Sequence, residues 1–144
     1  MVRGEPQMNR NLSVALTLLC TVATFSVAAW AKNFRLAATS VDPSATGVVD
    51  TDTDKNGNTT VDLKAEHLAK PGMLTPPANA YVLWFEQQGA DPESQGLLRV
   101  GDDLKAETKV TTPYHNFDIF ITAESDPSTH TPSDQVLLRT KIQQ

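Results

Sequence analysis

The sequence predicts an all-β protein, an antiparallel β-sandwich of seven or eight short strands. Apolar and polar residues alternate along most segments after residue 31, whereas the 3.6-residue period of a helix is hard to find. Turn-forming residues separate these segments at the spacing typical of sandwiches. The chain of 144 residues has the length of one ordinary domain, and the part after residue 31 is long enough to bury a core.

The first half of the domain contains three expected strands and one clear hairpin. The strands are expected at residues 34–40, 47–52 and 59–65. Asn56–Gly57 lies between the second and the third, and this dipeptide is a strong hairpin signal because both residues tolerate positive φ. We therefore expect the chain to reverse direction around residues 54–57.

The second half is expected to contain the centre of the sheet. Prolines interrupt regular structure between residues 70 and 77, because proline has no N–H to donate to a strand ladder. Residues 81–86 are apolar on both faces, which is typical of a central strand, and residues 88–96 form a loop. Further strands are expected at 96–100, 106–110, 117–122 and 135–142, with a polar loop at 125–134 before the last.

The N-terminus predicts export from the cytoplasm. Residues 1–11 carry Arg3 and Arg10, residues 12–31 carry no charge, and the stretch ends in Ala29-Trp30-Ala31. A positive start, an apolar core and an A-x-A ending describe a secretory signal peptide. The alternative is an uncleaved anchor helix, because about 20 apolar residues can span a bilayer. We therefore divide the chain into a signal or anchor (1–31) and an extracytoplasmic domain (32–144), periplasmic or secreted in the first case and membrane-anchored in the second.

The composition excludes several classes of protein. Twelve Lys and Arg face 17 Asp and Glu, a net charge of −5, and nucleic-acid binding needs a basic face instead. The one cysteine, Cys20, lies in the apolar N-terminal stretch, so the domain has no disulfide framework.

One segment has the spacing of a weak calcium site. Asp50, Asp52, Asp54 and Asn56 alternate just before Gly57, and such oxygens can converge on a hard cation. Position 12 of an EF-hand-type loop would be Leu63 instead of glutamate, and no helix is expected on either side. The competing interpretation is a solvated hairpin tip. No other cofactor is expected.

No catalytic arrangement is evident, so we expect no enzyme. The three histidines, His67, His115 and His130, do not have the spacing of a local zinc pair. His115 and Asp118 lie three residues apart, but no serine sits in a nucleophile turn nearby. The aromatic residues of the central strands are expected to fill the core.

The buried strands resemble the extracytoplasmic C-terminal domain of the anti-sigma-K factor family. The resemblance covers residues 63–138 and follows the order Leu68, Pro71, Tyr81-Val-Leu-Trp-Phe85, Gly96-Leu-Leu98, Ile121-Thr-Ala-Glu124, Pro127, Pro132 and Val136. It implies an Ig-like or related β-sandwich outside the membrane. At most eleven residues precede the apolar stretch, too few for the family's cytoplasmic sigma-binding part, so anti-sigma activity is not implied here.

These observations predict a non-catalytic binding module of the bacterial cell envelope. Its partner would be an envelope protein or a surface component, met through sheet edges or loops at one end. Nucleic acid is not expected as a partner. The alternative function is a calcium-stabilised structural module of the cell surface, built on the Asp50–Asn56 segment.

Overall fold

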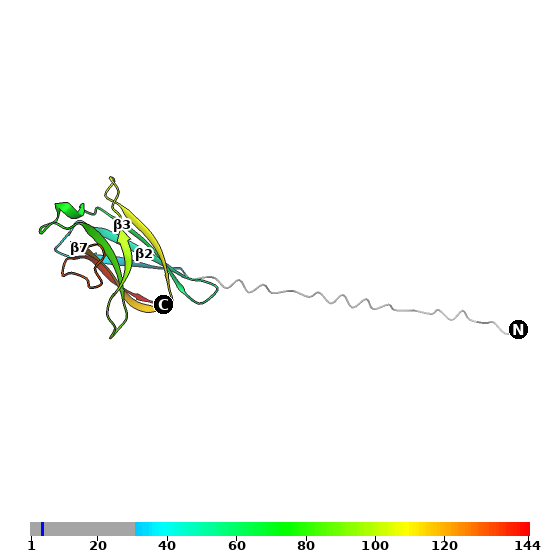
Figure 1. Ribbon diagram of the computed structural model, residues 1–144. Helices are drawn as coiled ribbons and strands as arrows, with labels where there is room; N and C mark the ends of the chain where they lie inside the picture. The colour runs from blue at the N-terminus through cyan, green and yellow to red at the C-terminus, as the bar shows by residue number, and fades with distance from the viewer. Residues whose placement is uncertain (1–3, 5–30) are drawn as a thin grey trace.

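The computed structural model describes Gly4 and residues 31–144, and the predicted signal or anchor segment otherwise lies outside the described residues (Figure 1). The described part is all-β, as expected. Its strands are β1 (Lys32–Ala38), β2 (Thr46–Thr53), β3 (Thr59–Glu66), β4 (Ala80–Glu86), β5 (Glu93–Leu98), β6 (Ala106–Thr112), β7 (Asn116–Glu124) and β8 (Val136–Gln143). One short 3₁₀ helix, η1 (Pro71–Met73), lies between β3 and β4. The described residues contain no helix long and apolar enough to cross a membrane.

The eight strands form one antiparallel sheet in the order β5-β4-β7-β8-β1-β2-β3-β6. The two edge strands, β5 and β6, approach each other, so the sheet is nearly closed on itself (Figure 1). The main core lies inside this curled sheet and takes side chains from all eight strands.

Strand β1 holds the two halves of the sheet together. Residues Lys32 to Leu36 pair with β2, and Ala37 and Ala38 pair with β8. At the point where β1 changes partner, Leu36 lies opposite Gly47 of β2. A Cβ atom on Gly47 would lie 3.1 Å from Leu138 Cδ1 and 3.3 Å from Leu36 Cβ. The glycine therefore lets two leucines pack directly against the backbone of β2.

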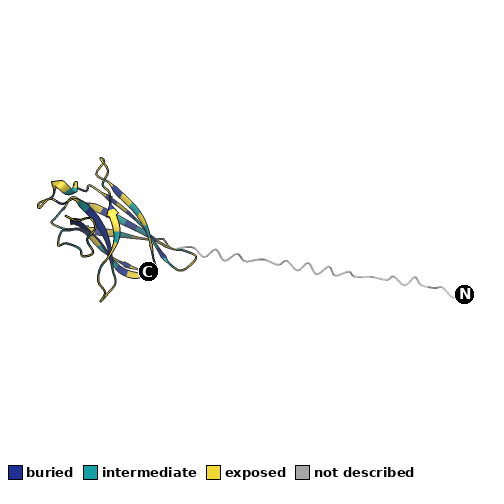
Figure 2. Ribbon diagram, in the orientation of Figure 1, coloured by how far each residue is buried: buried dark blue, intermediate teal, exposed yellow. Residues whose placement is uncertain are grey.

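Strand β4 is buried on both faces, as its sequence predicts. Tyr81, Leu83 and Phe85 point into the main core, whereas Val82 and Trp84 join a second apolar cluster with Phe120 on the outer face. The exposed fraction of every side chain from Tyr81 to Phe85 is 1% or less. Figure 2 shows exposed residues on the loops and on η1, and exposed residues alternating with buried ones along several strands.

The loop of residues 125–134 accounts for the burial of the outer cluster. Trp84 Nε1 donates to Thr122 Oγ1 over 2.8 Å, and the Thr122 hydroxyl donates to the Glu124 carboxylate. The same carboxylate accepts the Ser133 N–H at 2.8 Å, which holds the returning end of the loop. The middle of the loop, residues 127–130, lines a hollow together with residues 92–94. The loop therefore folds back across the outer face of β7 and β4 toward β5.

The main difference from the expected strands concerns β5. The sequence predicts a loop over residues 88–96, but the strand begins at Glu93. The chain already turns at residues 87–90, where the Ala90 N–H donates to the Gln87 carbonyl. Gln95 is an extra residue in the ladder with β4, and Gly96 beside it has φ of 107°. This β-bulge interrupts the alternation, which hides the first half of the strand in the sequence.

We predict that Gly47→Ala destabilises the domain, because the added Cβ overpacks the junction of β1, β2 and β8. The free energy of unfolding should fall by about 1–3 kcal/mol, measured by urea denaturation. Gly72→Ala is the matched control, since a Cβ there meets nothing within 4 Å. Equal stability of the two variants would contradict the role of Gly47.

Candidate interaction surface

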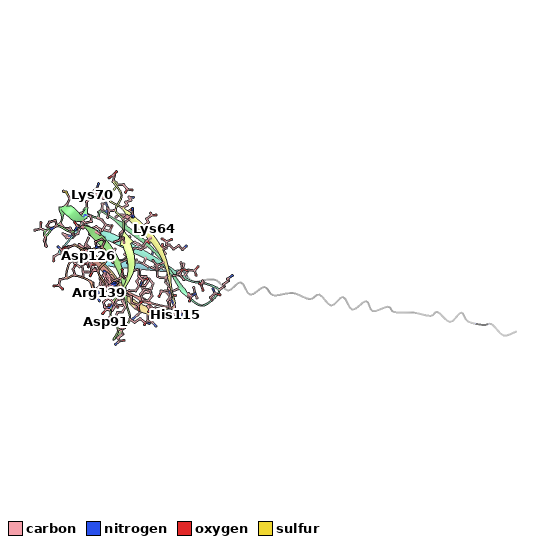
Figure 3. All side chains as sticks on the ribbon, viewed as in Figure 1. Lys64, Lys70, Asp91, His115, Asp126 and Arg139 are labelled. Carbon is pink, nitrogen blue, oxygen red and sulfur yellow. The ribbon has the colours of Figure 1, made fainter. Side chains whose placement is uncertain are left out.

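Two loops meet at one end of the sheet. Residues 67–79 connect β3 to β4 and contain three prolines, so the chain forms η1 and turns there instead of a strand. Residues 99–105 connect β5 to β6. Figure 3 shows Lys70, from the first loop, at the opposite end of the molecule from Asp91 and His115. We call this end the apical surface and define it as residues 67–79, Leu97 and residues 99–105.

Buried polar side chains fix the base of the apical surface. The Ala69 N–H donates to Asp42 Oδ2 at 2.9 Å, and the Ala69 carbonyl accepts the Tyr81 hydroxyl at 2.6 Å. Asp42 and Tyr81 are both buried. Burial, with a smaller contribution from the Asp42 charge, raises the pKa of Tyr81, so its hydroxyl remains a donor at physiological pH. The first loop is thus attached to the core through both backbone groups of one residue.

The two apical loops are also joined to each other. The Leu68 N–H donates to the Leu104 carbonyl at 3.1 Å, and Lys70 Nζ lies 2.8 Å from Asp102 Oδ1. The hydrogen bond and charge of Lys70 lower the pKa of Asp102. Both charged side chains are exposed, so this ion pair contributes little to stability and mainly orients the loops.

Exposed apolar side chains gather on the apical surface. Among the described residues, the exposed large hydrophobic side chains are Met73, Leu97 and Leu104, with exposed fractions of 79%, 48% and 41%. All three belong to this one end of the molecule. A hollow of about 400 Å³ beside Leu97 is lined by Lys70, Pro71 and Val100, among others. The surface therefore offers apolar contacts next to a cationic side chain, which suits a macromolecular partner.

Leu104 occupies a backbone conformation that normally requires glycine. The turn Gly101–Lys105 has the same two hydrogen bonds as the hairpin turn Asp54–Asn58: the first N–H donates to the fifth carbonyl, and the fourth N–H donates to the first carbonyl. The fourth residue is Gly57 in the hairpin, with φ of 83°, but Leu104 in the apical turn, with φ of 59°. A leucine is strained in the left-handed region because of its Cβ. The same turn thus occurs once in relaxed and once in strained form.

A third hollow, of about 330 Å³, lies over the ends of β4, β7 and β8. Its charged side chains pair with one another: Arg139 contacts Glu86 at 3.2 Å and Asp118 at 3.1 Å, and Lys141 lies 3.6 Å from Asp118. Because cations and carboxylates here compensate each other, the hollow presents no excess of either charge to a ligand.

The predicted calcium ligands lie along one strand and its turn. Asp50 Oδ1 accepts Asn33 Nδ2 at 2.7 Å, and Asp52 Oδ1 accepts the Thr53 N–H at 2.8 Å. The expected hairpin is present, and Asn56 lies in its turn. In the described part of the chain, no three His, Cys, Asp or Glu side chains come together as a metal site.

Asp54 organises the hairpin turn. Its Oδ1 accepts the N–H groups of Asn56 and Asn58 at 2.8 and 2.9 Å, and its Oδ2 accepts Asn58 Nδ2 at 3.1 Å. Three donors leave about one of the four acceptor positions of a carboxylate for any further ligand. The turn therefore accounts for Asp54 without a metal ion.

We predict that Asp54→Ala lowers the melting temperature in a pH-dependent way. Hydrogen bonds, chiefly from Asn58, lower the pKa of Asp54 in the folded protein. A group with a lowered folded pKa stabilises the fold above its unfolded pKa and loses that effect as pH falls through the folded pKa. The deficit of the variant should thus be full at pH 6 and shrink below the ordinary value of 3.8.

Asp54→Asn is the control, because it keeps one acceptor oxygen but has no charge to titrate. Its deficit at pH 6 should be smaller than that of Asp54→Ala, and the difference in melting temperature between the two variants should not depend on pH, because neither variant titrates at this position. A rise in the melting temperature of the wild type with millimolar calcium would instead identify the hairpin as a metal site.

The histidines lie on three different loops. His67 Nδ1 is 3.4 Å from Thr46 Oγ1, and His115 Nδ1 is 3.3 Å from Thr59 Oγ1. His130 lies in the loop that covers Trp84. Met73, Leu97 and Leu104 are not among the functional residues predicted from the sequence. A usable signal was Leu104, a lone apolar residue between Asp103 and Lys105 in the interval between two expected strands.

Comparison of the chain with protein-family models, with curated proteins and with solved structures finds no match. The resemblance to the anti-sigma-K factor family therefore stays a prediction. The segment Thr122-Ala-Glu124, which is part of that resemblance, has a structural role here. The side chains of Thr122 and Glu124 hold Trp84 and the loop of residues 125–134 through hydrogen bonds.

Proposed function

We propose that this chain is a non-catalytic, extracytoplasmic binding module of the bacterial cell envelope, and that its partner contacts the apical surface. The proposal rests on Leu104, whose side chain is exposed and whose backbone is in the left-handed region. The side chain is 41% exposed, so its burial recovers little free energy within the monomer. Its left-handed backbone costs about 1–2 kcal/mol relative to an ordinary conformation. A leucine kept under these conditions is best explained by contact with a partner.

The surroundings of Leu104 support the same function. Met73 and Leu97 are further exposed apolar side chains at the same end of the molecule, and the anchors at Ala69 hold the first loop in place before any partner binds. A prearranged apolar surface loses little conformational entropy on association. The partner is an envelope protein or a surface component that presents an apolar segment of its own.

We further propose that the nearly closed sheet is an Ig-like β-sandwich. Strands β2, β3 and β6 would form one layer and β5, β4, β7 and β8 the other, with β1 shared between them. The neighbours of each strand support this, because the chain passes between the layers from β3 to β4, from β5 to β6 and from β6 to β7. This is a Greek-key connectivity. Trp84 departs from the immunoglobulin pattern, since it lies outside the main core.

The N-terminal residues support an extracytoplasmic location through the positive start, the apolar stretch and the A-x-A ending. We predict that a Gram-negative host produces a soluble envelope species that begins at Lys32, as measured by fractionation and intact mass. A full-length species in the membrane fraction would instead identify an anchor, and a full-length cytoplasmic species would contradict export.

We predict that Leu104→Gly stabilises the protein and weakens its binding. Removing the strain should raise the free energy of unfolding by up to about 1 kcal/mol, measured by urea denaturation. A photocrosslinking residue at Met73 in the source bacterium should join the wild type to its partner. In the Leu104→Gly background the crosslink should fall at least about tenfold, which corresponds to about 1.4 kcal/mol.

The reciprocal variant, Gly57→Leu, is the matched control. It introduces the same strain into the same type of turn and should lower stability without affecting the crosslink. A Leu104→Gly variant that is more stable and still crosslinks at the wild-type level would contradict the proposed contact.

A further inference from the structure

The two edge strands of the sheet, β5 and β6, differ in the regularity of their hydrogen-bond ladders. Strand β5 is irregular, because the bulge at Gln95 and Gly96 breaks its ladder with β4. Strand β6 is regular over all seven residues and keeps an unbroken register with β3. Proteins usually protect edge strands with bulges, prolines, short length or charged side chains, and of these β6 has only charged side chains, Glu107 and Lys109. Its yellow ribbon in Figure 1 can be followed from the apical turn along the sheet edge.

The hydrogen-bond pattern identifies the free backbone groups of β6. The Asp54 N–H donates to the Asn58 carbonyl, so hydrogen-bonded pairs of β2 and β3 alternate from that point. The backbone of Asp62 therefore faces β2, and that of Leu63 faces β6. In the register of β3 with β6, Leu63 lies opposite Thr108, so the backbone of Thr108 faces β3. The backbone direction alternates along β6, and the N–H and C=O groups of Glu107, Lys109 and Thr111 therefore point away from the sheet. All three residues are exposed.

Charges alternate across this edge. Lys64 of β3 is the register partner of Glu107, and Asp62 of β3 is the partner of Lys109. Each of these two pairs forms a row of opposite charges across the sheet. An antiparallel strand added beside β6 would continue the alternation of charge in both rows if it placed a cation beside Glu107 and an anion beside Lys109. Strand β6 itself carries that pair of charges, two residues apart and in the required order.

We propose that β6 pairs antiparallel with β6 of a second copy of this chain, with Thr108 of each copy on the two-fold axis. In this register Glu107 of each copy lies opposite Lys109 of the other, and each row alternates in charge across the junction. Moving the axis to Lys109 or to Glu107 would place like charges opposite each other, which is destabilising. The pairing satisfies the free backbone groups of both edges and forms an isologous dimer.

The first experiment is sedimentation equilibrium at protein concentrations from about 10 µM to about 1 mM. The protein is purified in the form that a bacterial expression host exports. The wild type should show a monomer–dimer equilibrium. Glu107→Lys and Lys109→Glu should each weaken the dimer at least tenfold, because each places two like-charge pairs at the junction. A mixture of these two variants should dimerise again, because every pair across the junction is then opposite in charge.

Asp91→Lys and Lys55→Glu are the controls. They make the same kinds of charge change in exposed loops away from β6, and both should dimerise like the wild type. A wild type that stays monomeric up to about 1 mM overturns the proposal. So does a dimer that the two β6 variants leave unchanged, or a mixture of them that stays monomeric.

A crosslinking experiment tests the register. In a Cys20→Ser background, Thr108→Cys should form an intermolecular disulfide under mild oxidation, because residues on the axis form a closely spaced, non-hydrogen-bonded pair. Thr111→Cys lies on the same strand but opposite Lys105 of the other copy, so it should not crosslink. Crosslinking at position 111 and not at 108 would overturn the proposed axis.

Discussion

Strand β1 hydrogen-bonds to β2 along its first five residues and to β8 along its last two, and the rest of the fold depends on this change of partner. Without it, β2, β3 and β6 would be separate from the strands around β4. Gly47 makes the change possible, because Leu36 and Leu138 both occupy the space where its side chain would be. Both leucines belong to the main core, which takes side chains from both halves of the sheet.

Two turns have the same backbone hydrogen bonds but different residues at the left-handed position. The hairpin turn with Gly57 uses the residue that its geometry favours, and Asp54 completes its hydrogen bonds. The apical turn repeats the hydrogen bonds but exposes Leu104 in their strained position. Stability is thus optimised at one turn and not at the other. Such a local departure from turn chemistry is where a binding function is expected.

Alternation and turn residues sufficed to predict an all-β domain of seven or eight strands, the hairpin at Asn56–Gly57 and the burial of β4 on both faces. The start of β5 was predicted wrongly because the bulge at Gly96 breaks the period of two. The apical surface could not be predicted, because it joins loops that are far apart in sequence through Leu68 and Leu104. The turn function of Asp54 also depends on donors that only the folded backbone places.

The pairing of β1 with β8 has a consequence for the order in which the chain can fold. The first strand to be synthesised completes its ladder only when the last strand is available, so contacts between the two ends of the domain close the sheet. Folds that rely on such distant contacts form slowly. A nascent chain that lacks β8 leaves one flank of β7 without a partner and the core open. The sheet can thus be completed only when synthesis is nearly finished, a delay that would suit the export proposed above.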